Sequence, residues 1–119
     1  MNSIEDIREY CLSKQGVHES LPFNDTALVF KVGDKLFALL DLSDKNRGIT
    51  LKCDPDLVIE LREQHPEITP AFHFNKKHWN TIYLSGNMHY AEICKLIDHS
   101  YELAFGKLTK KMQREIKEL

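Results

Sequence analysis

The stretch that decides the fold is ALVFKVGDKLFALLDL, residues 27–42. Its first six residues favour a β-strand, Gly33-Asp34 is a two-residue hairpin signal, and residues 35–42 return as a second apolar strand. Gly48–Cys53 (GITLKC) follows after a short polar loop and predicts a third strand. Three strands with such short connections predict an antiparallel meander.

Capping and breaking residues place helices on both sides of this meander. Ser3 is a helix cap, and Ile4, Ile7 and Cys11 then share one helical face, which Gly16 is placed to end. Asp54-Pro55 starts a second helix that must end before Pro66. The remaining expectations are an extended connection over Val17–Asp25, strands over Ala71–Phe74 and Trp79–Leu84, a helix capped by Asn87 that breaks at Gly106, and a short basic helix over Leu108–Leu119.

The resulting element order is α-β-β-β-α-β-β-α, which predicts one α+β domain over residues 1–119. A two-layer architecture follows, with one antiparallel sheet and the helices on one of its faces, since crossovers long enough for a parallel sheet are absent. A length of 119 residues suits one core, and 42% hydrophobic with 29% charged residues is typical of a soluble globular protein.

Composition also narrows location and partners. The longest apolar run has five residues, 36–40, whereas a membrane span needs roughly 20, so no membrane partner is expected. The acidic N-terminal residues do not resemble a signal peptide, and three cysteines without a CxxC pair predict reduced thiols and a cytoplasmic location. Residues 1–69 carry eight Lys/Arg against thirteen Asp/Glu, and residues 70–119 carry eight against five, which indicates a basic second part.

The most distinctive segment is PAFHFNKKHWN, residues 70–80. A turn that carries Lys76 and Lys77 can donate several hydrogen bonds to phosphates, as can the side chains of His73, Asn75 and His78. The rings of Phe72, Phe74 and Trp79 could stack on bases, or could lie in the core, which the alternation of Phe72 and Phe74 favours. Together these residues suggest a nucleic-acid-binding wing.

A second basic segment lies near the C-terminus. Lys107, Lys110, Lys111 and Arg114 recur at helical spacings of three and four, so they form one stripe that could track a phosphate backbone. The alternative is an ordinary solvated helix face, since Glu115 and Glu118 lie nearby.

The sequence contains no pattern typical of a metal site or of a catalytic site. The six histidines and three cysteines match no HExxH, CxxC or two-Cys two-His pattern, so no metal or other cofactor is expected. The chain contains neither a GxSxG elbow nor a Gly-rich phosphate loop. A small-ligand or enzyme site would have to use a pocket around Trp79 and Tyr101, with His73 and His78 beside them. We therefore expect no catalytic residues and a protein that is not an enzyme.

Four pieces of the chain resemble the MmcQ/YjbR family. Residues 70–79 resemble its P-x-[YF]-H-x-N-K-x-H-W hallmark, with Ala71 where Gly is usual. Leu21-Pro22-Phe23, Lys35-Leu36-Phe37-Ala38 and Ser100-Tyr101-Glu102-Leu103 resemble its other short motifs, in the expected order, with Ala104 where Val is usual. The resemblance implies a fold close to the frataxin-like and secretion-chaperone-like architectures, and a DNA-binding role through a double-wing arrangement of loops.

Two functions follow as expectations. The first is weak, sequence-indifferent DNA binding through phosphates, because no recognition helix with base-reading residues is visible. The second is a protein-interaction or chaperone-like adaptor that uses the outer sheet face, with the oligomeric state left open.

Overall fold

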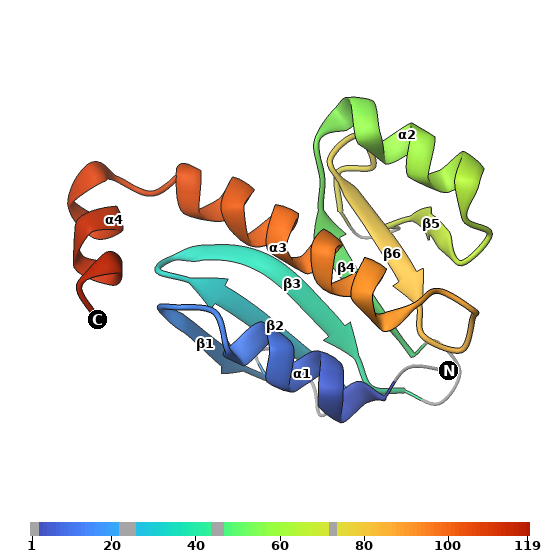
Figure 1. Ribbon diagram of the computed structural model, residues 1–119, viewed down its shortest axis with the longest axis horizontal. Helices are drawn as coiled ribbons and strands as arrows, with labels where there is room; N and C mark the ends of the chain where they lie inside the picture. The colour runs from blue at the N-terminus through green and yellow to red at the C-terminus, as the bar shows by residue number, and fades with distance from the viewer. Residues whose placement is uncertain (1–2, 22–25, 44–46, 72–73) are drawn as a thin grey trace.

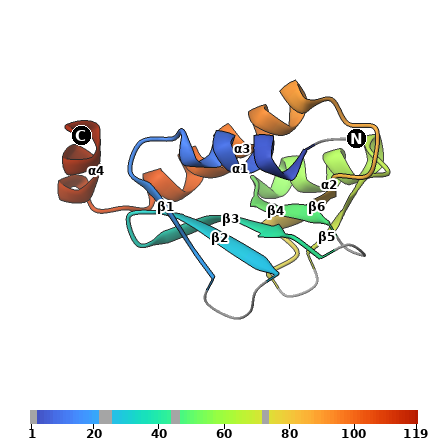
Figure 2. The same ribbon diagram turned by 90° about the horizontal axis from the view of Figure 1, so that it is seen from below.

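The computed structural model describes residues 3–21, 26–43, 47–71 and 74–119. Within these ranges a six-stranded sheet forms one layer, and helices α1 (Ile4–Leu12), α2 (Pro55–Gln64) and α3 (Tyr90–Gly106) form the other. The three helices cover the same face of the sheet (Figures 1 and 2). The predicted two-layer α+β architecture is confirmed. The strands are β1 (Val17–Ser20), β2 (Ala27–Val32), β3 (Lys35–Asp41), β4 (Gly48–Lys52), β5 (Ile68–Pro70) and β6 (Trp79–Tyr83).

The sheet has the order β1-β2-β3-β4-β6-β5, and every neighbouring pair is antiparallel. The decisive hairpin forms as predicted, with Val32 opposite Lys35 across the Gly33-Asp34 turn. Gly33 has a φ of 59°, the left-handed region that glycine adopts without steric cost. The meander of β2, β3 and β4 therefore forms the centre of the domain.

The helix signals are confirmed at two starts and corrected at two other positions. The Ser3 hydroxyl accepts from the Asp6 amide, and Asp54 caps α2 with Pro55 as its first residue. However, α1 ends at Leu12 instead of continuing to Gly16. The cap of α3 is His89 and not Asn87, because the Asn87 amide donates to the Glu67 carboxylate, 3.0 Å away, and so belongs to the preceding turn.

Two strand predictions were wrong. Residues 17–20, predicted as part of a connection, form the edge strand β1, which makes six strands where five were expected. The strand predicted over residues 71–74 lies instead at 68–70, where Ile68 pairs with Ile82 and is buried in the core. Ala71 and Phe74 lie outside any strand, and residues 72 and 73 of the predicted strand lie outside the described residues.

The core fills the space between the sheet and its helices. Phe30, Phe37 and Leu40 from the meander are completely buried there, as are Ile93 and Ile97 from α3. Ser100 of α3 is buried among them, and its hydroxyl donates to the Phe37 carbonyl and accepts from the Lys52 amide. One hydroxyl therefore joins β3, β4 and α3 at the same end of the sheet.

The last helix, α4 (Lys110–Lys117), lies beyond the end of α3 against two turns (Figure 1). A Cβ atom added to Gly16 would lie 2.8 Å from Ile116 Cγ2, and one added to Gly33 would lie 2.9 Å from Met112 Cε. Both glycines also have positive φ angles. Because Gly16 and Gly33 have no side chains, the apolar side of α4 can approach the two turns closely.

Candidate nucleic-acid interface

The hallmark segment forms a tight turn immediately before β6. The Asn75 carbonyl accepts from the amides of His78 and Trp79, and the Asn75 side chain accepts from the Lys77 amide at 3.0 Å. Asn75, Lys76 and Lys77 are exposed. Asn75 therefore shapes the turn, and the two lysines project from it. His73 lies outside the described residues.

A buried polar network holds this turn to α2. The Arg62 guanidinium donates to the Asn80 side chain at 2.7 Å, to the Lys76 carbonyl at 2.5 Å and to the Trp79 carbonyl at 3.4 Å. Asn80, which is only 4% exposed, also donates to the Val58 carbonyl. Contacts from Arg62 and Asn80 to backbone carbonyls therefore hold the turn to α2.

The rings beside the turn pack against one another. Phe74 and Trp79 have ring centroids 4.8 Å apart, and both residues are half-buried. Trp79 faces away from the helices, because Asn80 and Ile82 point toward them along the same strand. Half-buried His78 follows the lysines, and its carbonyl accepts from the Cys53 amide at 2.7 Å.

The second predicted segment forms a basic helix only from Lys110 onward, so the prediction of one helical stripe that includes Lys107 was wrong. Lys110, Lys111 and Arg114 are exposed on α4, and Lys107 is the C-cap of α3. Leu108, Met112 and Ile116 form the opposite, apolar side that packs on the glycine turns. Lys110, Lys111 and Arg114 therefore lie on the exposed side of α4, away from the surface that packs on the turns.

Sequence reasoning missed two lysines that lie between these segments. Lys52 ends β4 as the register partner of Trp79, and Lys35 begins β3 directly after the hairpin turn. Burial, together with the positive charges of Lys107 and Lys35, lowers the pKa of Lys52. No sequence motif links Lys35, Lys52 and Lys107. Lys35 and Lys52 are 17 residues apart along the chain, and Lys52 and Lys107 are 55 residues apart.

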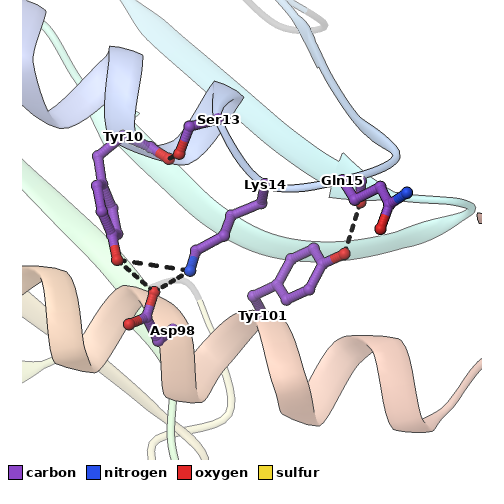
Figure 3. Close-up of polar contacts among 6 residues, drawn as sticks. All are labelled: Tyr10, Ser13, Lys14, Gln15, Asp98 and Tyr101. Carbon is purple, nitrogen blue, oxygen red and sulfur yellow. Dashed lines mark hydrogen bonds and ion pairs between the residues drawn. The ribbon is translucent and has the colours of Figure 1, made fainter. Parts of the chain in front are cut away.

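The structure does not bring Trp79 and Tyr101 into one pocket. Tyr101 lies on the helix-covered face, where its hydroxyl donates to the Gln15 carbonyl at 2.5 Å (Figure 3). Its ring meets the Phe37 ring edge-on. Trp79 faces the opposite side of the sheet. Ser100 and Tyr101 have packing contacts in the described residues.

The remaining titratable groups point to no further centre in the described residues. Cys11, Cys53 and Cys94 are free and buried. Burial raises the pKa of Cys11 to about 12 and that of Cys53 to about 11. Within the described ranges, no three His, Cys, Asp or Glu side chains gather in a way that could hold a metal ion. None of the described helices combines the length and apolar character needed to cross a bilayer.

Most of the chain is similar to a known protein family. The YjbR family model matches residues 12–103. The chain belongs to the YjbR family. The matched range includes the hallmark turn and ends before Lys107 and α4. The first basic segment therefore lies within the match to the YjbR model, and the second lies outside it.

Individual YjbR-like proteins agree over nearly the full length. Protein YjbR of Escherichia coli K12 is 33% identical over 117 residues, which are 98% of this chain and 99% of that protein. A Deinococcus radiodurans protein with a DUF419 domain superimposes with a TM-score of 0.90 at 36% identity, over 98% of this chain and 89% of its own. A Pseudomonas syringae protein gives a TM-score of 0.75 at 32% identity, over 87% and 99% respectively.

Proposed function

We propose that this protein binds duplex DNA weakly through its phosphates, without reading the base sequence. One wing is the turn with Asn75, Lys76, Lys77 and His78, to which His73 belongs in sequence. The other consists of Lys107 at the end of α3 and of Lys110, Lys111 and Arg114 on α4. The proposal includes a cytoplasmic location. It involves no catalytic step and no cofactor.

The observation that carries the proposal is the position of Lys52 between the two wings. Lys52 is the register partner of Trp79, the first residue after the turn, and it also lies within electrostatic reach of Lys107. Positive groups therefore extend from the turn to the end of α3. Such a row suits a phosphate backbone, whose charges repeat at regular intervals.

The available side chains favour phosphates over base edges. Apart from Arg114, the cations of the two wings are lysines, whose ammonium groups are point charges without the bidentate geometry that reads guanine. The exposed Asn75 of the turn already uses its side-chain oxygen within the turn. Base contacts are therefore not part of the proposal. The expected signature is strong salt dependence with little preference among sequences.

A salt-titrated anisotropy assay with a fluorescent random duplex tests the proposal. Three or four phosphate contacts predict a log–log slope of roughly −3. The Lys76→Ala/Lys77→Ala variant should flatten this slope by roughly two units, since each lost contact removes about 0.9. Lys95→Ala, at an exposed lysine on α3, is the matched control and should leave the slope unchanged.

Two results would reject DNA binding through these wings. One is the absence of binding at about 50 mM salt, and the other is an unchanged slope in the double variant. Either would favour a protein-interaction role for the sheet face opposite the helices, where Trp79 lies.

A further inference from the structure

The strand β6 carries two aromatic side chains on the sheet face opposite the helices. Trp79, Thr81 and Tyr83 are half-buried, whereas the two residues between them are buried, with Ile82 in the core. Alternation along a strand therefore places the three half-buried residues on the other face, away from α1, α2 and α3 (Figure 2). Trp79 and Tyr83 are separated by about 13 Å along the strand. This face thus presents two distinct rings.

Strand register fixes which side chains lie beside these rings. The hydroxyl oxygens of Thr50 and Thr81 are 2.8 Å apart, so both side chains point to the same face. Lys52, two residues after Thr50 on β4, lies on that face as well and is the register partner of Trp79. The Cβ atoms of register partners are about 5 Å apart on the sheet surface. A lysine side chain is therefore the direct neighbour of the indole.

The indole ring of Trp79 is held in place by its surroundings. The Phe74 ring packs on it with ring centroids 4.8 Å apart and planes inclined by 35°. The Trp79 carbonyl accepts from the Ala71 amide and from the Arg62 guanidinium, each at 3.4 Å, which fixes the backbone of the residue. A ring that is already fixed loses little conformational freedom when a ligand packs on it. Trp79 is therefore suited to stacking.

The charges near Trp79 are positive. Strands β4, β5 and β6 contain no aspartate or glutamate, and Lys52 lies beside the indole. Exposed Lys76 and Lys77 precede Trp79 in the turn. Asp54, which follows β4, uses its carboxylate to cap α2. A ligand that matches this face therefore combines flat rings with negative charge.

We propose that this face binds single-stranded DNA, with one unpaired base stacked on Trp79 and the adjacent phosphates bound by Lys52 and the turn lysines. Tyr83 offers a second ring to a base further along the strand. Bases in a duplex are stacked on one another, so only an unpaired base can lay its ring face on the indole. Stacking accepts every base and therefore requires no readout of base edges. The inference rests on the proposed function, because the turn lysines bind phosphates in both.

Fluorescence of the native protein measures stacking directly, because Trp79 is the only tryptophan. The probe is oligothymidylate, and the matched control is an abasic strand of equal length, which has the same phosphates without bases. Oligothymidylate should quench the emission and bind at least roughly fivefold more tightly, whereas the abasic strand should leave the emission unchanged. Equal quenching or equal affinity of the two strands would overturn the proposal.

The second experiment removes the rings one at a time and measures the anisotropy of labelled oligothymidylate. Trp79→Leu should weaken binding roughly tenfold, and Trp79→Phe should retain most of the affinity because a ring remains. Tyr83→Leu should also weaken binding, and it replaces Trp79→Leu if that variant fails to fold. Tyr90→Leu is the matched control, since Tyr90 is an exposed aromatic residue on α3, on the other side of the sheet. Unchanged affinity in folded variants of Trp79 and Tyr83 would overturn the proposal.

The outcomes separate this inference from the proposed function. Duplex binding that depends on Lys76 and Lys77, without quenching of Trp79 by oligothymidylate, supports the proposed function and rejects the stacking site. Quenching by oligothymidylate in a protein without detectable duplex binding supports the stacking site and rejects duplex binding. A dimer in sedimentation velocity that Trp79→Leu abolishes would assign the face to a second copy of the chain and overturn the proposal.

Discussion

Lys14 and Lys52 are both half-buried lysines, yet their surroundings are opposite. Lys14, at the junction of α1 and α3, forms an ion pair with Asp98, and its ammonium lies 4.9 Å from the centre of the Tyr10 ring (Figure 3). Burial lowers the pKa of Lys14, but the hydrogen bond and charge of Asp98 outweigh burial and raise it overall. At Lys52, burial and two like charges act in the same direction and lower the pKa.

The difference separates a cation that the fold pairs with a carboxylate from a cation that it leaves near like charges. Arg62 extends the comparison, because its guanidinium is engaged with three acceptors. Arg62 has three hydrogen-bond acceptors, Lys14 has one ion pair, and Lys52 has like charges near it. The three residues thus form a series of decreasing stabilisation of their charge. Equivalent substitutions along this series should therefore differ in size and in sign.

Arg62→Met should have the largest effect on stability. It removes the charged donor to buried Asn80 and to the turn carbonyls, and leaves the Asn80 oxygen without that partner. We expect a loss of about 3 kcal/mol in the free energy of unfolding, measured with urea. Glu63→Gln, at an exposed neighbour on α2, should change it by less than about 0.5 kcal/mol. A near-neutral Arg62→Met would mean that the turn does not depend on α2.

Alkaline pH should weaken the α1–α3 junction. The Cys11 pKa is raised from 9.0 to about 12 by burial, so the unfolded chain loses this proton first. The stabilisation is fully present below pH 9 and is lost as pH rises toward the folded-state pKa, by about 2 kcal/mol near pH ~10.5. Urea unfolding of wild type and Cys11→Ala should show a shallower decline in the variant. Parallel declines would assign the effect to other groups.

Lys14→Met should destabilise by about 1–2 kcal/mol, because Asp98 loses its counterion while Tyr10 keeps its 2.7 Å hydrogen bond to the carboxylate. The matched control is Lys95→Met, at an exposed position on α3. Thermal and urea unfolding measure the difference between the two variants. Equal stability of both would show that the Lys14 pair contributes nothing.

Lys52→Met should have the smallest effect and the opposite sign. Removing one of three like charges relieves repulsion, so the free energy of unfolding should stay constant or rise by about 0.5 kcal/mol at low salt. The gain should vanish at about 1 M salt, where the repulsion is screened. A loss comparable to that of Lys14→Met would show that Lys52 is a structural residue, contrary to the comparison.

Local signals in the sequence predicted most of the fold. Gly33-Asp34 specified the hairpin, and Asp54-Pro55 specified the start of α2, because each acts within a few residues. β1 was missed because His18, Glu19 and Ser20 read as polar connection, although the strand is held at the edge by β2 and by the Arg8–Glu19 ion pair. Contacts with β2 and with Arg8, both outside the segment itself, therefore determine that β1 is a strand.

The candidate site was only partly predictable for the same reason. The hallmark string correctly indicated an exposed turn with two lysines, and the spacing of the basic residues correctly indicated a helix from Lys110 onward but not at Lys107. Arg62, which holds the turn, lies on a different element. The charges of Lys35 and Lys107 affect the pKa of Lys52 only after β3, β4 and α3 have packed, so no local pattern could predict this effect.

The two outermost strands have a consequence for the protein at high concentration. β5 has three residues and ends at Pro70, which lacks an amide hydrogen, while β1 has four residues and carries His18 and Glu19. Short edges with a proline or charges give an incoming strand few groups to pair with. Edge-to-edge growth of the sheet into fibrils is thereby disfavoured at both ends, and crowded solutions of this protein should remain free of cross-β aggregates.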